Sequence, residues 1–254
     1  MYSLFALSLG VAACAPATVQ FPTGAGTSLQ GVSRIHGQIT RHCSAVHSFT
    51  AELTLAGRAL GERLRGRVIA GFAQPDAMRL EGVAPFGAPV FVLVSRAGVS
   101  TLLLSKQSAV LTGEAPEEVL AALIGVSLGP ADLRALLTGC VTDAPVTTGA
   151  GFSNGWASLS YTDETTTFLR RTNDTWAVRG ARRGRWLIEF PAWSGTFPSE
   201  VRLRSEDVDL AVQVQQVEAN AGIDPAAFTV RVPVGTRRLT LDDVRRAGTM
   251  REIP

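Results

Sequence analysis

Apolar residues along the chain change from helical to strand-like spacing. In residues 28–46 they lie three and four positions apart, which predicts one amphipathic helix. From residue 49 the period becomes two, as in half-buried strands. The strands predicted in this half are 49–55, 64–72, 78–83, 90–95, 100–104 and 109–112. Their connections are only a few residues long, which favours an antiparallel meander over parallel crossovers.

Helical spacing returns between residues 113 and 139, in two short pieces. Pro116 and Pro130 suit the first turn of a helix, and Gly139 ends the second piece. After a loop expected at 142–151, strands are predicted at 156–161, 166–171, 175–179, 185–190, 200–204 and 207–218. Thr240 then begins a capping box and a final helix at 241–247. We find no internal repeat, so the pattern predicts a mainly β (α+β) domain with one sheet of about eleven antiparallel strands.

Composition adds limits on function. Of 254 residues, 46% are hydrophobic, enough for a sizeable core, and 18% are charged. The 24 basic and 22 acidic residues leave a net charge of +2, so we expect no nucleic-acid partner. His36, His42 and His47 lack metal-ligand spacing, and no Gly-x-Ser-x-Gly elbow is present. We therefore expect no metal, no cofactor and no enzymatic activity, although an enzyme with an unrecognised site is an alternative.

The N-terminus predicts export and lipidation. Residues 1–13 form an apolar run that is too short to span a bilayer and suits a signal peptide. Its end, VAAC, resembles a bacterial lipobox, in which Cys14 is acylated, although no basic residue precedes the run. Residues 14–27 then form a flexible tether rich in Pro and Gly, and 28–254 the folded domain. The alternative is a chance apolar N-terminus with an ordinary buried cysteine.

The remaining two cysteines fit an oxidising compartment. With Cys14 acylated, Cys43 and Cys140 form an even pair, and we expect them to be joined in a disulfide. This bond would close a loop of about 98 residues and add roughly 4 to 5 kcal/mol on the chain-entropy model. The alternative is two unpaired buried thiols.

Several segments together resemble a known family. The lipobox and first helix are followed by a meander with RLEGVAPFG at 79–87, a helical pair ending LRALLTGC at 133–140, and FTVRVP at 228–233. In order and pattern, residues 28–238 resemble the LolA/LolB-like family of periplasmic lipoprotein-localisation proteins, and within it the outer-membrane-anchored receptors. This resemblance implies a curved, incomplete β-barrel whose concave apolar face is covered by short helices and accepts acyl chains.

The resemblance also implies a cavity between sheet and helices. Its expected sheet-side residues are Leu53, Phe72, Leu80, Phe91, Leu93 and Leu103, and its expected helix-side residues are Leu120, Leu123, Ile124, Leu133 and Leu137. An ordinary dry core built by the same residues is the alternative.

Two further features have both a functional and a structural interpretation. Pro85 and Pro89 bracket Phe86 in a turn, where the resemblance implies a membrane-facing side chain; a Phe folded back to plug the barrel is the alternative. Six arginines, interleaved with Trp176 and Trp186, suit lipid phosphates or a simple solvated face. They are Arg170, Arg171, Arg179, Arg182, Arg183 and Arg185.

The resulting hypothesis is a monomeric lipoprotein on the periplasmic face of the bacterial outer membrane. It would receive lipoproteins from a periplasmic lipoprotein carrier, bind their acyl chains or another lipid, and insert them into the membrane that holds its own lipid anchor. Ala15 after Cys14 favours the outer membrane, because it is not the aspartate that retains some lipoproteins at the inner membrane. The alternative is a structural or regulatory envelope lipoprotein that binds a protein partner with the same fold.

Overall fold

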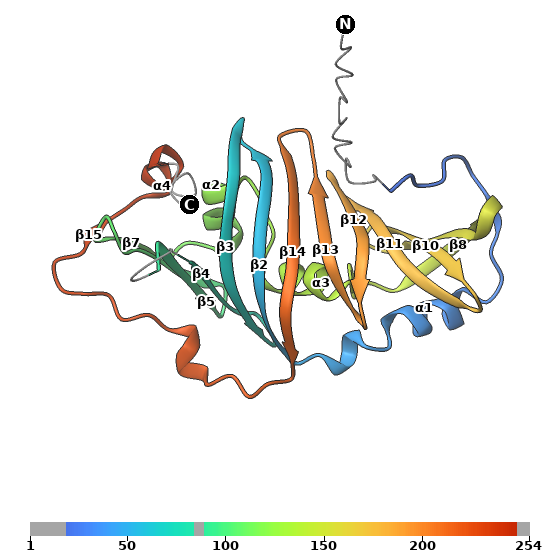
Figure 1. Ribbon diagram of the computed structural model, residues 1–254, viewed down its shortest axis with the longest axis horizontal. Coiled ribbons are helices and arrows are strands. Elements are labelled where there is room, and N and C mark those ends of the chain that lie inside the picture. Colours follow the sequence, from blue (N-terminus) through green and yellow to red (C-terminus); the bar gives the residue numbers. More distant parts are fainter. Residues whose placement is uncertain (1–18, 84–88, 248–254) are drawn as a thin grey trace, which may run out of the picture.

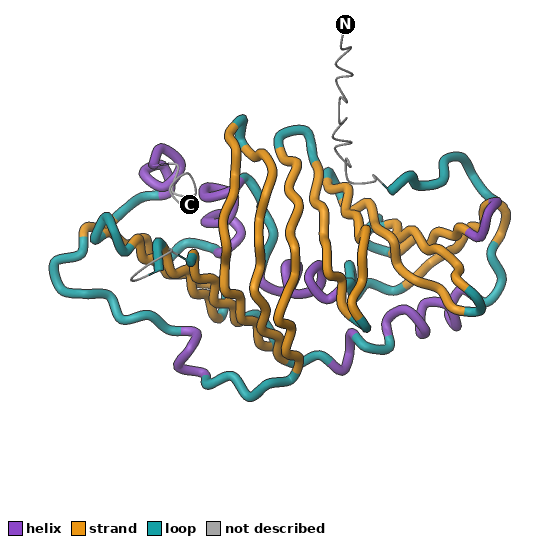
Figure 2. The backbone as a smooth tube through the Cα atoms, viewed as in Figure 1, coloured by secondary structure: helices purple, strands orange, loops and turns teal. Residues whose placement is uncertain are grey.

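The computed structural model of the chain describes residues 19–83 and 89–247. These residues form one open, strongly curved sheet with short helices on its inner face (Figures 1 and 2). In the part of the chain that the structure describes, the strand order is β1-β8-β9-β10-β11-β12-β13-β14-β2-β3-β4-β5-β6-β7-β15. The incomplete barrel is confirmed, with fifteen strands in these residues rather than about eleven.

The elements have the following bounds. The strands are β1 (Thr27–Ser28), β2 (Ser48–Ala59), β3 (Glu62–Ala73), β4 (Ala77–Gly82), β5 (Phe91–Arg96), β6 (Val99–Leu104), β7 (Ala109–Thr112), β8 (Val146–Phe152), β9 (Trp156–Tyr161), β10 (Thr166–Thr172), β11 (Thr175–Arg183), β12 (Trp186–Ser194), β13 (Phe197–Arg204), β14 (Val208–Ala219) and β15 (Arg237–Arg238). The α-helices are α1 (Val32–Thr40), α2 (Pro116–Ile124), α3 (Pro130–Thr138) and α4 (Leu241–Ala247), and the 3₁₀ turns are η1 (Cys43–Ala45), η2 (Ser153–Gly155) and η3 (Pro225–Phe228).

Strands β1, β8 and β15 are the additions to the predicted set. Strand β8 lies mostly in the segment expected as a loop, and its Thr- and Gly-rich sequence carries no clear period of two. It is extended because it pairs with β9 on one side and β1 on the other. Strand β15 pairs parallel with β7, whereas every other pairing that the structure describes is antiparallel.

The helices follow their sequence signals except at α1. Prolines begin α2 and α3, and Gly139 ends α3 in the left-handed region with φ of 76°. The expected helix at 28–46 is shorter, because Gly31 has φ of 71° and the chain turns through η1 at Cys43–Ala45. Helix α4 has its expected bounds. At its start, the carboxylate of Asp243 accepts hydrogen bonds from the backbone N–H of Thr240, the Arg246 guanidinium and the Thr240 hydroxyl. These hydrogen bonds lower the pKa of Asp243 to about 2.

The β2–β3 hairpin is longer than the alternation alone predicted. Both strands continue into the gap between the predicted strands 49–55 and 64–72. They meet at the two-residue turn Leu60–Gly61, where φ is 52° and 78°. Two consecutive positive φ values match a type I′ turn, whose twist suits an antiparallel hairpin. The pair forms the centre of the sheet, next to β14 (Figure 1).

The two faces of the sheet have different coverings. Its inner face bears α1 on the β8–β11 half and α2 and α3 behind the central strands (Figure 1), and the main core cluster lies between these layers. On the outer face, the chain after β14 crosses β4 and β5 through η3. Arg79 on that face donates hydrogen bonds to the carbonyl oxygens of Ala227 and Thr229 at 2.7 and 3.2 Å, which hold this segment in place.

Close packing at Gly57 gives a stability prediction. This residue of β2 has φ of 152°, and a Cβ there would overlap the carbonyl oxygen of Asp209 on β14. We expect Gly57→Ala to lower the free energy of unfolding by about 2–3 kcal/mol in a urea titration. Gly71→Ala is the matched control, since its Cβ would have only the Thr50 methyl at 4.0 Å. Equal effects of the two substitutions would contradict the packing argument.

Candidate functional site

An apolar cavity lies between the inner face of the sheet and helices α2 and α3. Its volume is about 100 Å³. Every side chain that lines it is aliphatic or aromatic: Leu53, Leu55, Val68, Phe72, Leu80, Phe91, Leu93, Leu120, Leu123, Ile124, Val126, Leu133, Leu136, Leu137, Val201, Leu203, Leu210 and Val212. Such a lining offers burial to hydrocarbon and no proton donor, acceptor or nucleophile.

Local sequence periods direct these side chains inward. Leu120, Leu123 and Ile124 lie at i, i+3 and i+4 on α2, and Leu133, Leu136 and Leu137 repeat that spacing on α3. On the strands, alternate residues reach the same face, as Leu53 and Leu55 do on β2. The cavity therefore has a sheet floor and a two-helix cover.

Ten of the eleven residues expected at the cavity line it, and Leu103 is the exception. In β6 the alternation directs Leu102 and Leu104 into the core, where they are 0% and 1% exposed. Leu103 pairs with Val92 of β5 and Val110 of β7 on the outer face. Three consecutive leucines satisfy either choice of face, so the sequence pattern could not identify the inward residues.

Sequence reasoning also missed eight residues of the lining. Leu55 and Val68 alternate in phase with predicted residues on β2 and β3, and Leu136 lies beside Leu137 on α3, so the same periods could have identified them. The others are Val126, Val201, Leu203, Leu210 and Val212. Four of these lie on β13 and β14, distant in sequence from the first meander, and they reach the cavity because β14 pairs with β2.

The cavity is smaller than an acyl-chain site. Ligand pockets for small molecules usually measure about 300 Å³ or more, and a cavity of about 150 Å³ holds only benzene. At about 100 Å³ the cavity is too small for an acyl chain in this arrangement of α2 and α3. Binding of an acyl chain would therefore require α2 and α3 to move away from the sheet.

Polar contacts connect the ends of α2 and α3 to the sheet. Arg183 of β11 forms an ion pair with Asp132 of α3 at 2.7 Å. Next to it, Arg185 donates a hydrogen bond at 3.3 Å to the carbonyl oxygen of Gly125, which follows α2. These contacts are partly exposed to solvent, where ion pairs contribute at most about 1 kcal/mol, so they attach the helices weakly.

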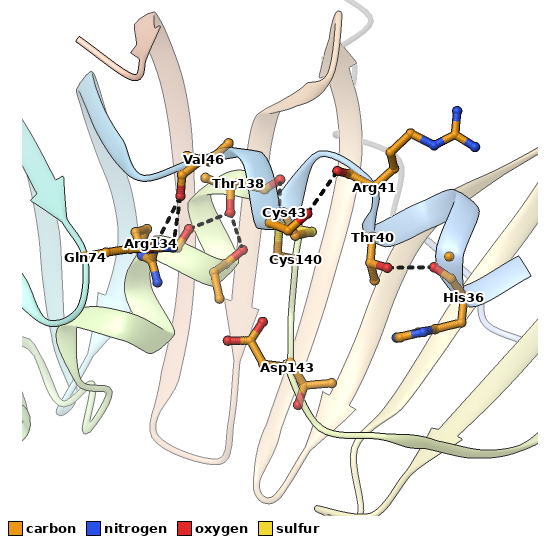
Figure 3. A pocket seen from close by; sticks show the side chains of 14 residues that line it. His36, Thr40, Arg41, Cys43, Val46, Gln74, Arg134, Thr138, Cys140 and Asp143 are labelled. Carbon is orange, nitrogen blue, oxygen red and sulfur yellow. Dashed lines mark hydrogen bonds between the residues drawn. A yellow bond between two sulfur atoms is a disulfide. The ribbon is translucent and has the colours of Figure 1, made fainter. Parts of the chain in front are cut away.

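A covalent contact attaches the end of α3. Cys43 in η1 and Cys140, directly after α3, are joined in a disulfide with Cα atoms 5.8 Å apart (Figure 3). This is the pair that the sequence predicted. The bond connects the C-terminal end of the cavity cover to the chain between α1 and β2.

A polar groove of about 420 Å³ lies beside this disulfide (Figure 3). Arg134 of α3 donates a hydrogen bond to the carbonyl oxygen of Val46 at 3.2 Å, and Gln74 donates to the same oxygen at 3.4 Å. Leu133, Leu136 and Leu137 of α3 line the cavity, whereas Arg134 and Thr138 line the groove. The helix thus separates an apolar site from a polar one.

His42 and the buried Tyr161 have structural partners in this region. His42 Nε2 lies 3.0 Å from the carbonyl oxygen of Thr138 and within 4 Å of both disulfide sulfurs. Because both cysteines are oxidised, this cluster contains no thiolate ligand for a metal ion. Burial raises the pKa of Tyr161, and a hydrogen bond with the Thr167 hydroxyl partly offsets that rise.

The expected arginine cluster divides between different partners. Arg171 forms an ion pair with Asp174 at 3.1 Å, Arg183 and Arg185 contact the cavity cover, and Arg179 donates to the carbonyl oxygen of Pro191. Arg170 and Arg182 lie on the outer face, above aromatic rings. Strand alternation separates residues that are close in sequence, so the six do not form one basic surface.

Two expected functional residues, Cys14 and Phe86, lie outside the described residues. Part of the expected tether is described: Val19 and Phe21 contact the outer face of the sheet. Among the residues that the structure describes, none of the helices has the length and apolar character needed to cross a membrane.

Comparison with known proteins supports the fold. No protein-family model matches the chain, and no curated protein sequence matches it. A DUF1329 family protein from Desulfovibrio piger is similar in structure, with a TM-score of 0.54, 13% identity, and coverage of 79% of this chain and 98% of that one. A LolA superfamily protein from Nitrosomonas europaea has a TM-score of 0.51, 8% identity, and coverage of 81% and 99%. The LolA-like fold expected from the sequence is therefore confirmed.

Proposed function

We propose that this protein is a lipid-anchored envelope lipoprotein that binds acyl chains between its sheet and its helical cover. The observation that carries the proposal is the cavity, whose entire lining is apolar although helices and strands distant in sequence build it. An all-apolar pocket on the inner face of a half-barrel suits hydrocarbon chains better than a polar substrate. The LolA-like fold supports the same conclusion.

In the finer form of the proposal, the protein acts as an outer-membrane receptor. It takes lipoproteins from a periplasmic carrier and inserts them into the membrane that holds its own anchor at Cys14. No bond is made or broken, and the direction is set by affinity. Each methylene that the small cavity leaves exposed to water gains about 0.8 kcal/mol when it enters the bilayer, so transfer runs toward the membrane.

Native mass spectrometry of the Cys14→Ser chain tests acyl binding. This variant cannot be acylated at position 14, and export to an oxidising compartment retains the disulfide. We expect a co-purified species with the mass of a lipid or lipopeptide, whose fragments identify the cargo. A clean apo mass, together with no uptake of a fluorescent fatty-acyl probe, would contradict the proposal and favour a dry core in a protein that binds a protein partner.

A further inference from the structure

The described N-terminal segment lies against the outer face of the sheet. The backbone N–H of Val19 donates a hydrogen bond at 3.1 Å to Glu189 of β12. The Phe21 ring stacks on Phe168 of β10, with centroids 4.5 Å apart. Gly180 of β11 makes this contact possible, because a Cβ there would overlap the Phe21 ring. The segment is therefore attached to the fold from Val19 onward.

This attachment limits the distance between the fold and the proposed anchor. Cys14 precedes Val19 by five positions. An extended chain covers at most about 3.6 Å per residue, so the two residues are at most about 18 Å apart. If Cys14 is acylated, Val19 on the outer face lies within that distance of the anchor.

The same face carries basic and aromatic side chains, which we name the Phe21 patch: Phe21, Trp156, Phe168, Arg170 and Arg182. The Arg170 guanidinium lies 5.3 Å from the centre of the Trp156 ring, and that of Arg182 lies 5.2 Å from the centre of Phe168. Arg182 is exposed and Arg170 half-buried. Both guanidinium groups therefore lie beside aromatic rings on the outer face.

The strands that carry the patch contain no exposed carboxylate. Within β9 to β12 the sequence contains one carboxylate, Glu189. That residue is completely buried and forms an ion pair with Arg204 at 3.1 Å. Other acidic residues nearby, Asp163, Glu164 and Asp174, lie in the turns that connect these strands.

We propose that the Phe21 patch docks on the anionic phospholipid headgroups of the membrane that holds the anchor. Guanidinium groups bind phosphate oxygens in pairs, and tryptophan is favoured at the level of the headgroups. The short connection to Cys14 keeps this face close to the anchor, with Val19 at most about 18 Å away. The inference rests on the lipid anchoring of the proposed function and adds an orientation and a lipid class to it.

Vesicle sedimentation of the Cys14→Ser chain tests the docking surface without the anchor. The vesicles contain either phosphatidylcholine alone or equal parts of phosphatidylcholine and phosphatidylglycerol. We expect binding to the anionic vesicles only, and weaker binding at high salt. The R170Q/R182Q variant should bind about 25-fold more weakly, since each basic side chain near an anionic surface contributes about fivefold.

The matched control is R63Q/R65Q, which removes two exposed arginines from the outer face of β3. An equal loss in this control, or equal binding to both kinds of vesicle, would overturn the docking proposal. Thermal unfolding followed by circular dichroism checks that both variants fold. The mass of the wild-type N-terminal peptide reports acylation separately: an acylated Cys14 without vesicle binding overturns only the docking surface, and an unmodified Cys14 overturns the proposed anchor.

Discussion

Leu123→Gln and Leu137→Gln are expected to weaken binding of a fluorescent fatty-acyl probe by about 5- to 150-fold. Both leucines line the cavity, one on each helix of its cover. A glutamine in either position places an amide without a hydrogen-bond partner against the bound hydrocarbon, which costs about 1–3 kcal/mol. Probe titration followed by fluorescence measures the change, and far-UV circular dichroism confirms that the sheet remains folded.

The control for this experiment is Leu103→Gln, the same change at a residue that faces away from the cavity. We expect this variant to bind the probe with wild-type affinity. Unchanged uptake in both the Leu123 and Leu137 variants would exclude the two helices from the site. A loss in the Leu103 variant as large as theirs would show that the probe reports general destabilisation.

Removal of the disulfide by C43S/C140S is expected to lower the free energy of unfolding by about 4–5 kcal/mol. The two cysteines are 97 positions apart, and a loop of this length gains much conformational freedom in the unfolded chain when the bond is absent. Urea unfolding measures the loss, and the wild-type chain in reducing agent should unfold at nearly the same urea concentration as the variant. A difference below about 1 kcal/mol would contradict this account.

The same variant tests whether the cavity cover must move. Because the disulfide attaches the end of α3, its removal should increase the rate of probe uptake, provided that the variant is measured below its unfolding transition. Stopped-flow fluorescence gives this rate. Unchanged rates would contradict an opening of α3 that the disulfide restricts.

Much of the fold could be predicted from local signals. Prolines at first turns and a glycine after the last turn correctly placed α2 and α3, and the Thr240–Asp243 capping box placed α4. Period-two alternation located twelve of the strands. These signals are readable because each depends on backbone preferences or on burial of one face, and both act over a few residues.

Strand pairing determined the remaining strands and part of the site. Strand β8 has no sequence period of its own, and it is extended because neighbouring strands satisfy its backbone groups. Leu103 was misplaced because three consecutive leucines fit either face, and only the register with β5 and β7 decides between them.

By itself, the sequence determined the type of almost every element, since spacing and turn residues act locally; ten residues of the cavity lining followed from the family resemblance together with these patterns. The tertiary structure alone decided that β14 pairs with β2 and brings Val201 and Leu210 to the same cavity. It also decided that the cavity is small and that Val19 and Phe21 lie on the outer face. These features depend on contacts between residues far apart in the chain, which a local pattern does not encode.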